Sequence, residues 1–351
     1  MLQFGMDYGR GAHPEILNRI IDLNMRGTEG YGEDEISEIA RRKILNECGL
    51  RDGMVFFLVG GTQTNAVAID WLLHRGEGVI ATDTSHINVH ESGAIEEEGH
   101  KVITLESDGA GRLDAGALRQ YLSEFYSDPT WPHMVLPGMV YISQPTELGT
   151  LYTYDQLATL REVCDEYELK LYVDGARLVY ALGSPENNVS LHDIAALTDA
   201  FYIGGTKCGT LFGEALVIPG YYTTKERMRL FNLIKRHGAL LAKGWLTAAQ
   251  FDVLIGDGLY KQIGKEAVAH ALHLKEELCA LGLKPFIDSP TNQQFFTLPN
   301  EAAYELSRSV AFDTWGSPGP THTKIRLVTD WSTTSDTLSR LLEYLRQLPL
   351  S

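Results

Sequence analysis

Residues 170–207 decide the fold of this chain, and they read KLYVDGARLVYALGSPENNVSLHDIAALTDAFYIGGTK. Two short apolar runs, 170–173 and 200–203, have the β-branched and aromatic composition of buried strands. Between them, Ser190 is a favoured N-cap residue and is followed by apolar residues at helical spacing. The order strand, helix, strand predicts a crossover unit whose two strands run parallel in one sheet.

Both predicted strands of this unit end next to a charged residue. Asp174 follows the first strand, and Lys207 follows the second after two glycines and a threonine. The ends of parallel strands meet at one edge of a sheet, where α/β folds bind small ligands. A buried Asp174 needs a partner, which is either a cation such as Arg177 or the protonated ring nitrogen of pyridoxal phosphate. Lys207 is either a surface lysine or an amine of lowered pKa that forms a Schiff base with an aldehyde.

The chain on both sides of this unit, up to about residue 220, repeats the alternation of strand and helix patterns. Repeated alternation of this kind predicts an α/β fold with a mostly parallel sheet between helices. We therefore expect a large domain built on a mostly parallel seven-stranded sheet. The expected strands are 55–59, 78–81, 101–105, 139–143, 170–173, 200–203 and 214–218, and the expected helices include 64–74, 114–126, 154–167 and 190–197.

The pattern changes near residue 227, where longer helical segments replace the alternation. The segment 284–346 then mixes strand and helix patterns in an α+β order. We place a domain boundary near residue 250. Residues 1–250 are expected to form a large domain that binds pyridoxal phosphate, with an irregular N-terminal arm over 1–14, and residues 251–351 a small C-terminal α+β domain.

Composition and charge narrow the choice of partners. With 351 residues, 44% of them hydrophobic, the chain is long enough to bury a large core. The formal net charge is −16 and no segment is strongly basic, which argues against nucleic acid and acidic membrane surfaces as partners. We expect neither a signal peptide nor a membrane span. The four cysteines lack C-x-x-C spacing, so a reducing, cytoplasmic location is expected.

Three further sites carry residues suited to a cofactor enzyme. The turn at residues 60–62, Gly-Gly-Thr, lies between a predicted strand and helix, where backbone N–H groups bind anions, although such turns are common. His86 either packs in the core, stacks on an aromatic ring or transfers a proton. Arg326, inside an apolar strand pattern, points to solvent or binds an anion such as a substrate carboxylate. With Asp174 and Lys207, the turn at 60–62 completes the set that pyridoxal phosphate requires.

Other catalytic patterns are missing from the sequence. There is no G-x-S-x-G motif, no Walker loop and no G-x-G-x-x-G motif after a strand. His86 and His90 have the i,i+4 spacing of metal ligands, but no third ligand or H-E-x-x-H pattern accompanies them. We therefore expect no metal site.

Seven motifs, taken in order and spacing, resemble the low-specificity threonine aldolase and phenylserine aldolase group of pyridoxal-phosphate enzymes. The resemblance covers residues 6–328 or so and implies the aspartate-aminotransferase-like fold, known as fold type I. It also implies a small-molecule amino-acid substrate and a homo-oligomer, a tetramer built from dimers. The motifs are YGED (31–34), GGTQTN (60–65), SHIN (85–88), QPTELGTLYT (144–153), YVDGAR (172–177), GGTKCG (204–209) and IRLVT (325–329).

The resemblance also assigns roles to residues of this sequence. Lys207 would carry the cofactor and His86 would stack on its ring, and both would be catalytic. In this family the active site lies at a dimer interface, so Tyr31 would enter the partner's site and Lys243 would reach the partner's phosphate. Cofactor-binding roles are implied for Gly61, Thr62, Gln63, His86, Asp174, Arg177, Thr206 and Lys207, and substrate-binding roles for Asp7, Tyr31, Arg177 and Arg326.

Two positions depart from the pattern of the family. Met6 replaces a serine that helps to bind the substrate carboxylate. Residues 144–147, Gln-Pro-Thr-Glu, occur where many threonine aldolases have a histidine ahead of a glycine turn. The base that removes the β-hydroxyl proton is therefore open among His86, a water molecule and Glu147.

The expected activity is that of a lyase that cleaves the Cα–Cβ bond of a β-hydroxy-α-amino acid. Threonine, allo-threonine or phenylserine would give glycine and an aldehyde. One alternative is another reaction on the same cofactor, such as β-elimination or racemisation, because Lys207 and Asp174 serve all of these reactions. The other alternative is a catalytically silent relative that keeps the fold for ligand binding.

Overall fold

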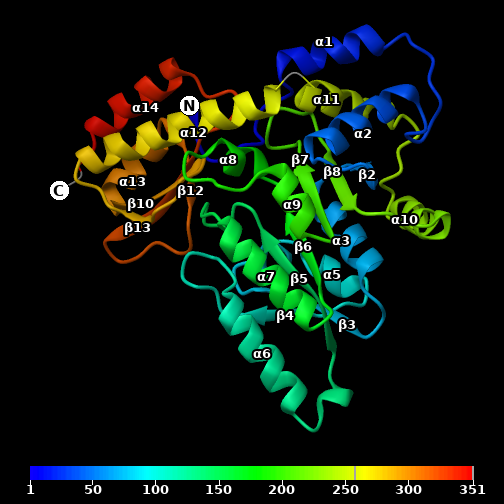
Figure 1. Ribbon diagram of the computed structural model, residues 1–351. Helices are drawn as coiled ribbons and strands as arrows, with labels where there is room; N and C mark the ends of the chain where they lie inside the picture. The colour runs from blue at the N-terminus through cyan, green and yellow to red at the C-terminus, as the bar shows by residue number, and fades with distance from the viewer. Residues whose placement is uncertain (257, 350–351) are drawn as a thin grey trace.

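The computed structural model describes residues 1–256 and 258–349, and its centre is a seven-stranded sheet (Figure 1). The strands of this sheet are β2 (Gly53–Leu58), β3 (Glu77–Thr82), β4 (Val102–Leu105), β5 (Leu136–Ser143), β6 (Lys170–Asp174), β7 (Ala200–Gly204) and β8 (Glu214–Pro219). They lie in the order β2-β8-β7-β6-β5-β3-β4, and only β8 runs against its neighbours. The predicted α/β fold with a mostly parallel sheet of seven strands is confirmed.

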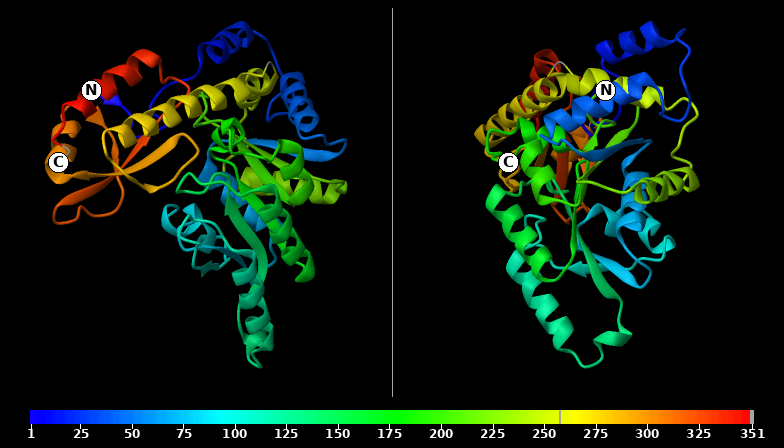
Figure 2. Two further views of the ribbon diagram at one scale, coloured as in Figure 1. Left: turned by 60° about the vertical axis from the view of Figure 1, so that its left-hand side comes forward. Right: turned by 45° about the vertical axis from the view of Figure 1, so that its right-hand side comes forward.

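The two faces of this sheet bury different layers of helices (Figures 1 and 2). Successive side chains of a strand point to opposite faces, so in β6 Leu171 and Val173 face one layer, and Tyr172 faces the other. Asp174 continues the alternation on the side of Tyr172. That side is covered by α3 (Gly61–Leu72), α5 (Ala94–Glu97) and α10 (Thr224–Arg236), and the opposite side by α6 (Ala115–Ser127), α7 (Tyr154–Glu166) and α9 (Leu191–Leu197).

Several helices start at a capping residue that the sequence shows. Ser190 is the N-cap of α9, and its Oγ accepts a hydrogen bond from the Asp193 N–H at 3.2 Å. The Asp193 carboxylate in turn accepts the Ser190 N–H at 2.8 Å, which completes a capping box. The remaining helices of the large unit are α1 (Pro14–Leu23), α2 (Glu35–Glu47), α4 (His86–Val89), α8 (Leu178–Gly183), α11 (Trp245–Gly256) and the 3₁₀ turn η1 (Trp131–His133).

One helix of the crossover unit, α8, had no counterpart in the sequence prediction. It packs against the long helix α12 (Leu259–Ala280), and the two helices cross at Gly183 and Gly264. A Cβ atom on Gly183 would lie 2.2 Å from the backbone carbon of Gly264, so only glycine permits this approach. No helix of the described residues has the length and apolar character needed to span a bilayer.

A second, four-stranded antiparallel sheet lies in the C-terminal part of the chain (Figure 2). Its strands are β9 (Pro285–Ile287), β10 (Gln293–Pro299), β12 (Asp313–Thr314) and β13 (His322–Val328), and its helices are α13 (Asn300–Ser307) and α14 (Ser335–Arg346). The order is β12-β13-β10-β9, and α12 runs from the large sheet to this one. This arrangement agrees with the expected C-terminal α+β unit, while the boundary near residue 250 stays a prediction.

The N-terminal segment is not wholly irregular, as residues 1–14 were expected to be. The strand β1 (Leu2–Gln3) pairs in parallel with β11 (Val310–Ala311), and the Val328 N–H donates to the Phe4 carbonyl at 2.7 Å. Leu2 and Phe4 are buried in the core of the C-terminal unit. A strand of two residues is too short to show periodicity, which is why the sequence did not reveal it.

Gly175, directly after Asp174, should be intolerant of any side chain. An added Cβ would lie 1.8 Å from the Tyr202 carbonyl oxygen, so β6 and β7 would have to move apart. We predict that Gly175→Ala lowers the free energy of unfolding by roughly 3 kcal/mol or more. Gly27→Ala is the matched control, because Gly27 has no neighbour within 4 Å. Denaturant unfolding of both variants measures the difference, and equal stabilities would contradict the prediction.

Candidate active site

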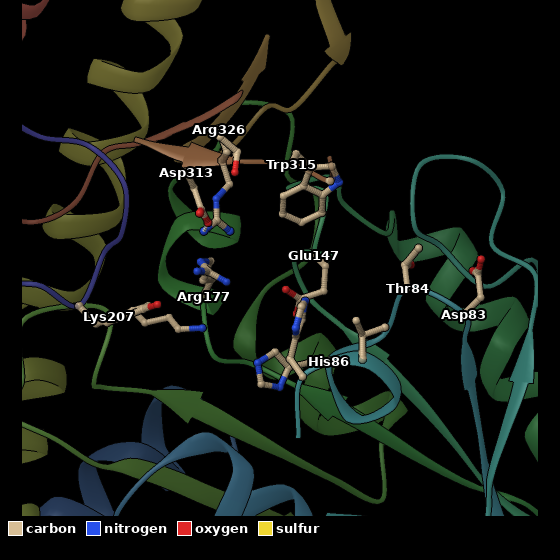
Figure 3. A pocket seen from close by; sticks show the side chains of 14 residues that line it. Asp83, Thr84, His86, Glu147, Arg177, Lys207, Asp313, Trp315 and Arg326 are labelled. Carbon is tan, nitrogen blue, oxygen red and sulfur yellow. Dashed lines mark hydrogen bonds and ion pairs between the residues drawn. The ribbon is translucent and has the colours of Figure 1, made fainter. Parts of the chain in front are cut away.

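A pocket of about 650 Å³ lies between the large sheet and the C-terminal sheet (Figure 3). Four segments that follow the C-terminal ends of β3, β5, β6 and β7 line it, as expected for an α/β fold, and β13 closes it from the C-terminal side. The predicted residues Lys207, His86, Arg177 and Arg326 meet in this pocket. The full lining is Tyr8, Asp83, Thr84, His86, Val89, His90, Glu147, Arg177, Lys207, Asp313, Thr314, Trp315, Gly316 and Arg326.

Lys207 directs its amine into the pocket, with Arg177 and His86 around it (Figure 3). Within the described residues Nζ makes no hydrogen bond or ion pair, while the backbone is held by Tyr180, whose hydroxyl donates to the Lys207 carbonyl at 2.6 Å. Burial and the charge of Arg177 lower the pKa of Lys207. A larger fraction of the amine is therefore neutral, and nucleophilic, than in an exposed lysine.

Asp174 lies beneath the pocket lining and accepts four hydrogen bonds. The hydroxyls of Tyr202 and Tyr141 donate to its two oxygens at 2.5 and 2.6 Å. The Asn65 amide and the Ala176 N–H each donate at 3.0 Å. Although burial acts to raise the pKa of Asp174, the two tyrosines lower it below its ordinary value. The carboxylate is thus held ionised, and a ligand N–H would have to share it with these donors or replace one of them.

Arg177 does not pair with Asp174, which corrects the salt bridge considered from the sequence. Arg177 Nε and Nη2 instead donate to the Asp7 carboxylate at 2.7 and 3.1 Å. Asp7 is fully buried, accepts a further bond from Asn292 Nδ2 at 3.1 Å, and does not line the pocket. Asp7 therefore lies behind Arg177, where it neutralises and orients the guanidinium.

His86 is connected to Asp174 through two buried side chains that the sequence reasoning missed. His86 Nδ1 lies 2.7 Å from Glu91 Oε1. Asn65 Nδ2 lies 2.8 Å from the same oxygen and also donates to Asp174. Burial opposes a charge on His86, but the hydrogen bond to Glu91 and the charges of Glu147 and Asp174 produce a net rise in its pKa.

The first turn of α3 has the donors of an anion site. Within the described residues, the N–H groups of Gly61, Thr62 and Gln63 make no hydrogen bond, as is usual in a first helical turn. The Gln63 side chain is not free, because it bonds the Val59 N–H and the His237 carbonyl. A Cβ on Gly61 would lie 3.0 Å from the Tyr202 hydroxyl, so this turn adjoins the surroundings of Asp174.

These features can be tested against the cofactor that the sequence predicts. Pyridoxal phosphate needs donors for a phosphate, an anion for the ring nitrogen and an amine for its aldehyde. The α3 turn, the ionised Asp174 and the Lys207 amine, which has no partner among the described residues, are chemically suited to these three needs. The residues of this site therefore fit pyridoxal phosphate.

Thr206 is held by Glu214, a buried acid that the sequence analysis did not identify. Glu214 accepts the Thr206 hydroxyl at 2.7 Å and the Gly205 N–H at 2.8 Å. Burial raises the pKa of Glu214 to about 7. These bonds fix the turn that leads into Lys207, and Thr206 does not line the pocket.

Arg326 reaches the pocket from β13 with its guanidinium partly bonded. Nη1 donates to Gln293 Oε1 at 2.9 Å, and Nη2 donates to Asp313 Oδ2 at 2.6 Å. The buried Nε has no hydrogen-bond partner in the described part of the chain. Trp315 lies against the guanidinium, with 5.5 Å between its ring centroid and Arg326 Cζ.

Tyr31 and Lys243 lie away from this pocket, next to each other on the surface. The Tyr31 N–H donates to the carbonyl of Ala242, the residue before Lys243, at 3.1 Å. Lys235 lies over the Tyr31 ring at 4.5 Å from its centroid. Neither residue is among those that line the pocket in the described part of the chain, and their expected role in a partner's site stays a prediction.

The missed residues left one usable signal in the sequence. Tyr141 and Tyr202 stand in otherwise apolar strands, and a buried tyrosine hydroxyl needs a polar partner. Two such strands flank β6, so their hydroxyls could have been assigned to Asp174. Glu91 lies in a stretch rich in polar residues, whereas Glu214 begins an apolar strand and Asp313 has apolar neighbours, and no sequence pattern marks any of the three as part of a site.

Comparisons with known proteins agree with this geometry. The beta-eliminating lyase family matches residues 12–283. A low-specificity L-threonine aldolase of a Pseudomonas species is 30% identical over 284 residues, which cover 80% of this chain and 78% of that protein. The solved structure of Leishmania major threonine aldolase is 41% identical, with a TM-score of 0.94 over 99% of both chains. Thermus thermophilus aspartate aminotransferase shares the fold at 16% identity and a TM-score of 0.69, over 99% of this chain and 91% of that one.

The raised pKa of Glu214 predicts a dependence of stability on pH. The Glu214 carboxyl has a pKa of about 7 in the folded protein, against an ordinary value of 4.5. It therefore binds more protons in the folded than in the unfolded state between these two pH values. Its contribution to stability is complete below pH 4.5 and is lost as the pH rises through 7. Glu214→Gln does not titrate, so the stability of the wild type relative to this variant should fall by up to about 3 kcal/mol between pH 5 and 8. Denaturant unfolding across this range measures the slope, with the exposed Glu301→Gln as control, and parallel curves would refute the assignment.

Proposed function

We propose that this chain, which belongs to the threonine aldolase group of the beta-eliminating lyase family, cleaves the Cα–Cβ bond of a β-hydroxy-α-amino acid. The products are glycine and an aldehyde, and the cofactor is pyridoxal 5′-phosphate. The observation that carries the proposal is the Lys207 amine, which has no partner among the described residues, shares one pocket with Arg326 and lies close to the ionised Asp174 network.

The cofactor would be held by four parts of the chain. Lys207 would bind its aldehyde, and Asp174 its ring nitrogen. The N–H groups at residues 61–63 would bind the phosphate, as helix N-termini do. His86 would stack on the ring. When bound, pyridoxal phosphate accepts the electron pair that is left on Cα when the bond to Cβ breaks.

In this proposal the two arginines bind the substrate and Lys207 transfers protons. Arg326 binds the substrate carboxylate, and Arg177 adds positive charge beside it. Because the pKa of Lys207 is lowered, its amine can accept a proton from the incoming ammonium group and return one to Cα when glycine forms. The protein therefore orients the scissile bond and moves protons.

The β-hydroxyl proton needs a base, and we assign this role to Glu147. Glu147 lines the pocket near His86 and Arg177 (Figure 3). His86 is less suited to this role, because Glu91 occupies its Nδ1 and the raised pKa leaves a smaller fraction of the ring neutral and able to accept a proton. A carboxylate here would take the place of the histidine that many threonine aldolases carry in the corresponding turn.

A homo-oligomer, a tetramer built from dimers, is part of the proposal. It is supported by the adjacent positions of Tyr31 and Lys243 on the surface outside the pocket of their own chain. The cytoplasmic location rests on the spacing of the cysteines and stays a prediction.

The first test of this proposal is chemical. Purified protein should take up pyridoxal phosphate and become yellow, and borohydride should fix the cofactor covalently to Lys207. Lys207→Ala should abolish both this linkage and the release of aldehyde from threonine, allo-threonine and phenylserine. Mass spectrometry of the reduced protein and an aldehyde assay measure the two effects. Loss of a β-substituent from another amino acid, with no aldehyde from these three, would favour β-elimination instead.

The second test concerns Arg326. Arg326→Ala should raise KM roughly ten- to a hundredfold while the yellow cofactor stays bound, because charge-assisted hydrogen bonds to the carboxylate, worth about 1.5–3 kcal/mol, are lost. Steady-state kinetics and the absorption spectrum give the two readouts. Unchanged kinetics would remove Arg326 from the substrate site.

A further inference from the structure

We propose that Asp313 acts as an internal competitor for the substrate carboxylate at Arg326. Its carboxylate occupies part of the guanidinium and must turn away when an amino acid binds. The proposal rests on the proposed function in one respect, the role of Arg326 as the carboxylate-binding residue. It adds a residue that sets the affinity of the site for its substrate.

The first observation is the set of bonds that the guanidinium makes. Gln293 accepts from Nη1 and Asp313 accepts from Nη2, whereas Nε is buried without a partner in the described chain. A buried donor without a partner costs free energy, so this edge favours an added acceptor. A carboxylate that binds an arginine in the bidentate manner uses two N–H groups at once. An incoming carboxylate that takes Nε and Nη2 would satisfy the first and displace Asp313 from the second.

The second observation is that Asp313 is placed to leave without disturbing the fold. It lies on the two-residue edge strand β12, directly opposite Arg326 on β13. Its side chain is 50% exposed, against 10% for Arg326, and its only hydrogen bond within the described residues is the one to Nη2. Rotation of one half-exposed side chain therefore frees the guanidinium. Gln293 and the Trp315 ring remain to hold it in place.

The third observation is that Asp313 itself lines the pocket, so it and the ligand face the same space (Figure 3). The apparent affinity for a ligand falls with the fraction of protein in the binding-competent arrangement. Only the fraction of molecules in which Asp313 has released Nη2 can bind a carboxylate through two N–H groups. Asp313 thus weakens the binding of every amino acid by a similar factor, and it favours ligands whose own carboxylate can reach Nε.

The experiment measures the binding of glycine, the common product, to the cofactor-loaded enzyme by isothermal titration calorimetry. Asp313→Asn removes the charge and keeps the shape, so the Kd for glycine should fall roughly three- to tenfold. Asp83→Asn is the matched control, since Asp83 also lines the pocket and bonds the Ser107 N–H instead of Arg326. This control should leave the Kd unchanged. Arg326→Ala should raise the Kd strongly, and in its presence Asp313→Asn should have no further effect.

Two outcomes would overturn the proposal. An unchanged Kd in Asp313→Asn would mean that Asp313 does not compete with the ligand, and an increased Kd would mean that it orients Arg326 for binding. An unchanged Kd in Arg326→Ala would remove the site at which the competition takes place. Neither outcome depends on turnover, because glycine binding and aldehyde release are measured separately. Tighter glycine binding in Asp313→Asn without any aldehyde release would support the competition and would contradict only the aldolase activity.

Discussion

The rest of the active site depends on one constraint, the burial of an ionised carboxylate at the end of β6. Asp174 is 4% exposed, and a buried charge is tolerated only when it is fully hydrogen-bonded. The hydroxyls of Tyr141 and Tyr202, from the two neighbouring strands, meet this need together with Asn65 from α3. Asn65 also bonds Glu91, and Glu91 bonds His86. The hydrogen bonds that stabilise the buried Asp174 are therefore part of a network that extends to His86 in the pocket.

The charges of the pocket divide into paired and unpaired groups, and this division explains its chemistry. Arg177 is neutralised by the buried Asp7, and Arg326 is partly occupied by Asp313. The Lys207 amine has no acidic partner in the described residues, and burial together with the nearby cation of Arg177 lowers its pKa. Within the described residues no ion pair holds Lys207 in its charged form, which favours the neutral, nucleophilic amine. Asp7 also bonds Asn292, so the N-terminal segment joins the large unit to the C-terminal one at the site itself.

Much of the fold followed from patterns within single elements. The alternation of apolar runs and amphipathic segments predicted the seven strands, and Ser190 predicted the start of α9. The elements that escaped prediction were short, such as β1 and β12, or lay in apolar sequence without a clear start signal, such as α8. Such elements are stabilised by partners distant in the sequence, and periodicity within a short window does not record those partners.

The sequence by itself determined that Asp174 and Lys207 lie at the ends of two parallel strands of one sheet, because local hydrophobic patterns mark the strands and a crossover unit joins parallel strands. Only the tertiary structure decided which groups those residues meet. Asp7, which lies 170 residues away in the sequence, is the partner of Arg177. Asp313 and Glu214 are nearer in the sequence, and they bind Arg326 and the turn before Lys207 across neighbouring strands. The physical reason is that a hydrogen bond or ion pair depends on distance in space, and a single polar residue carries no periodic signal that predicts this distance.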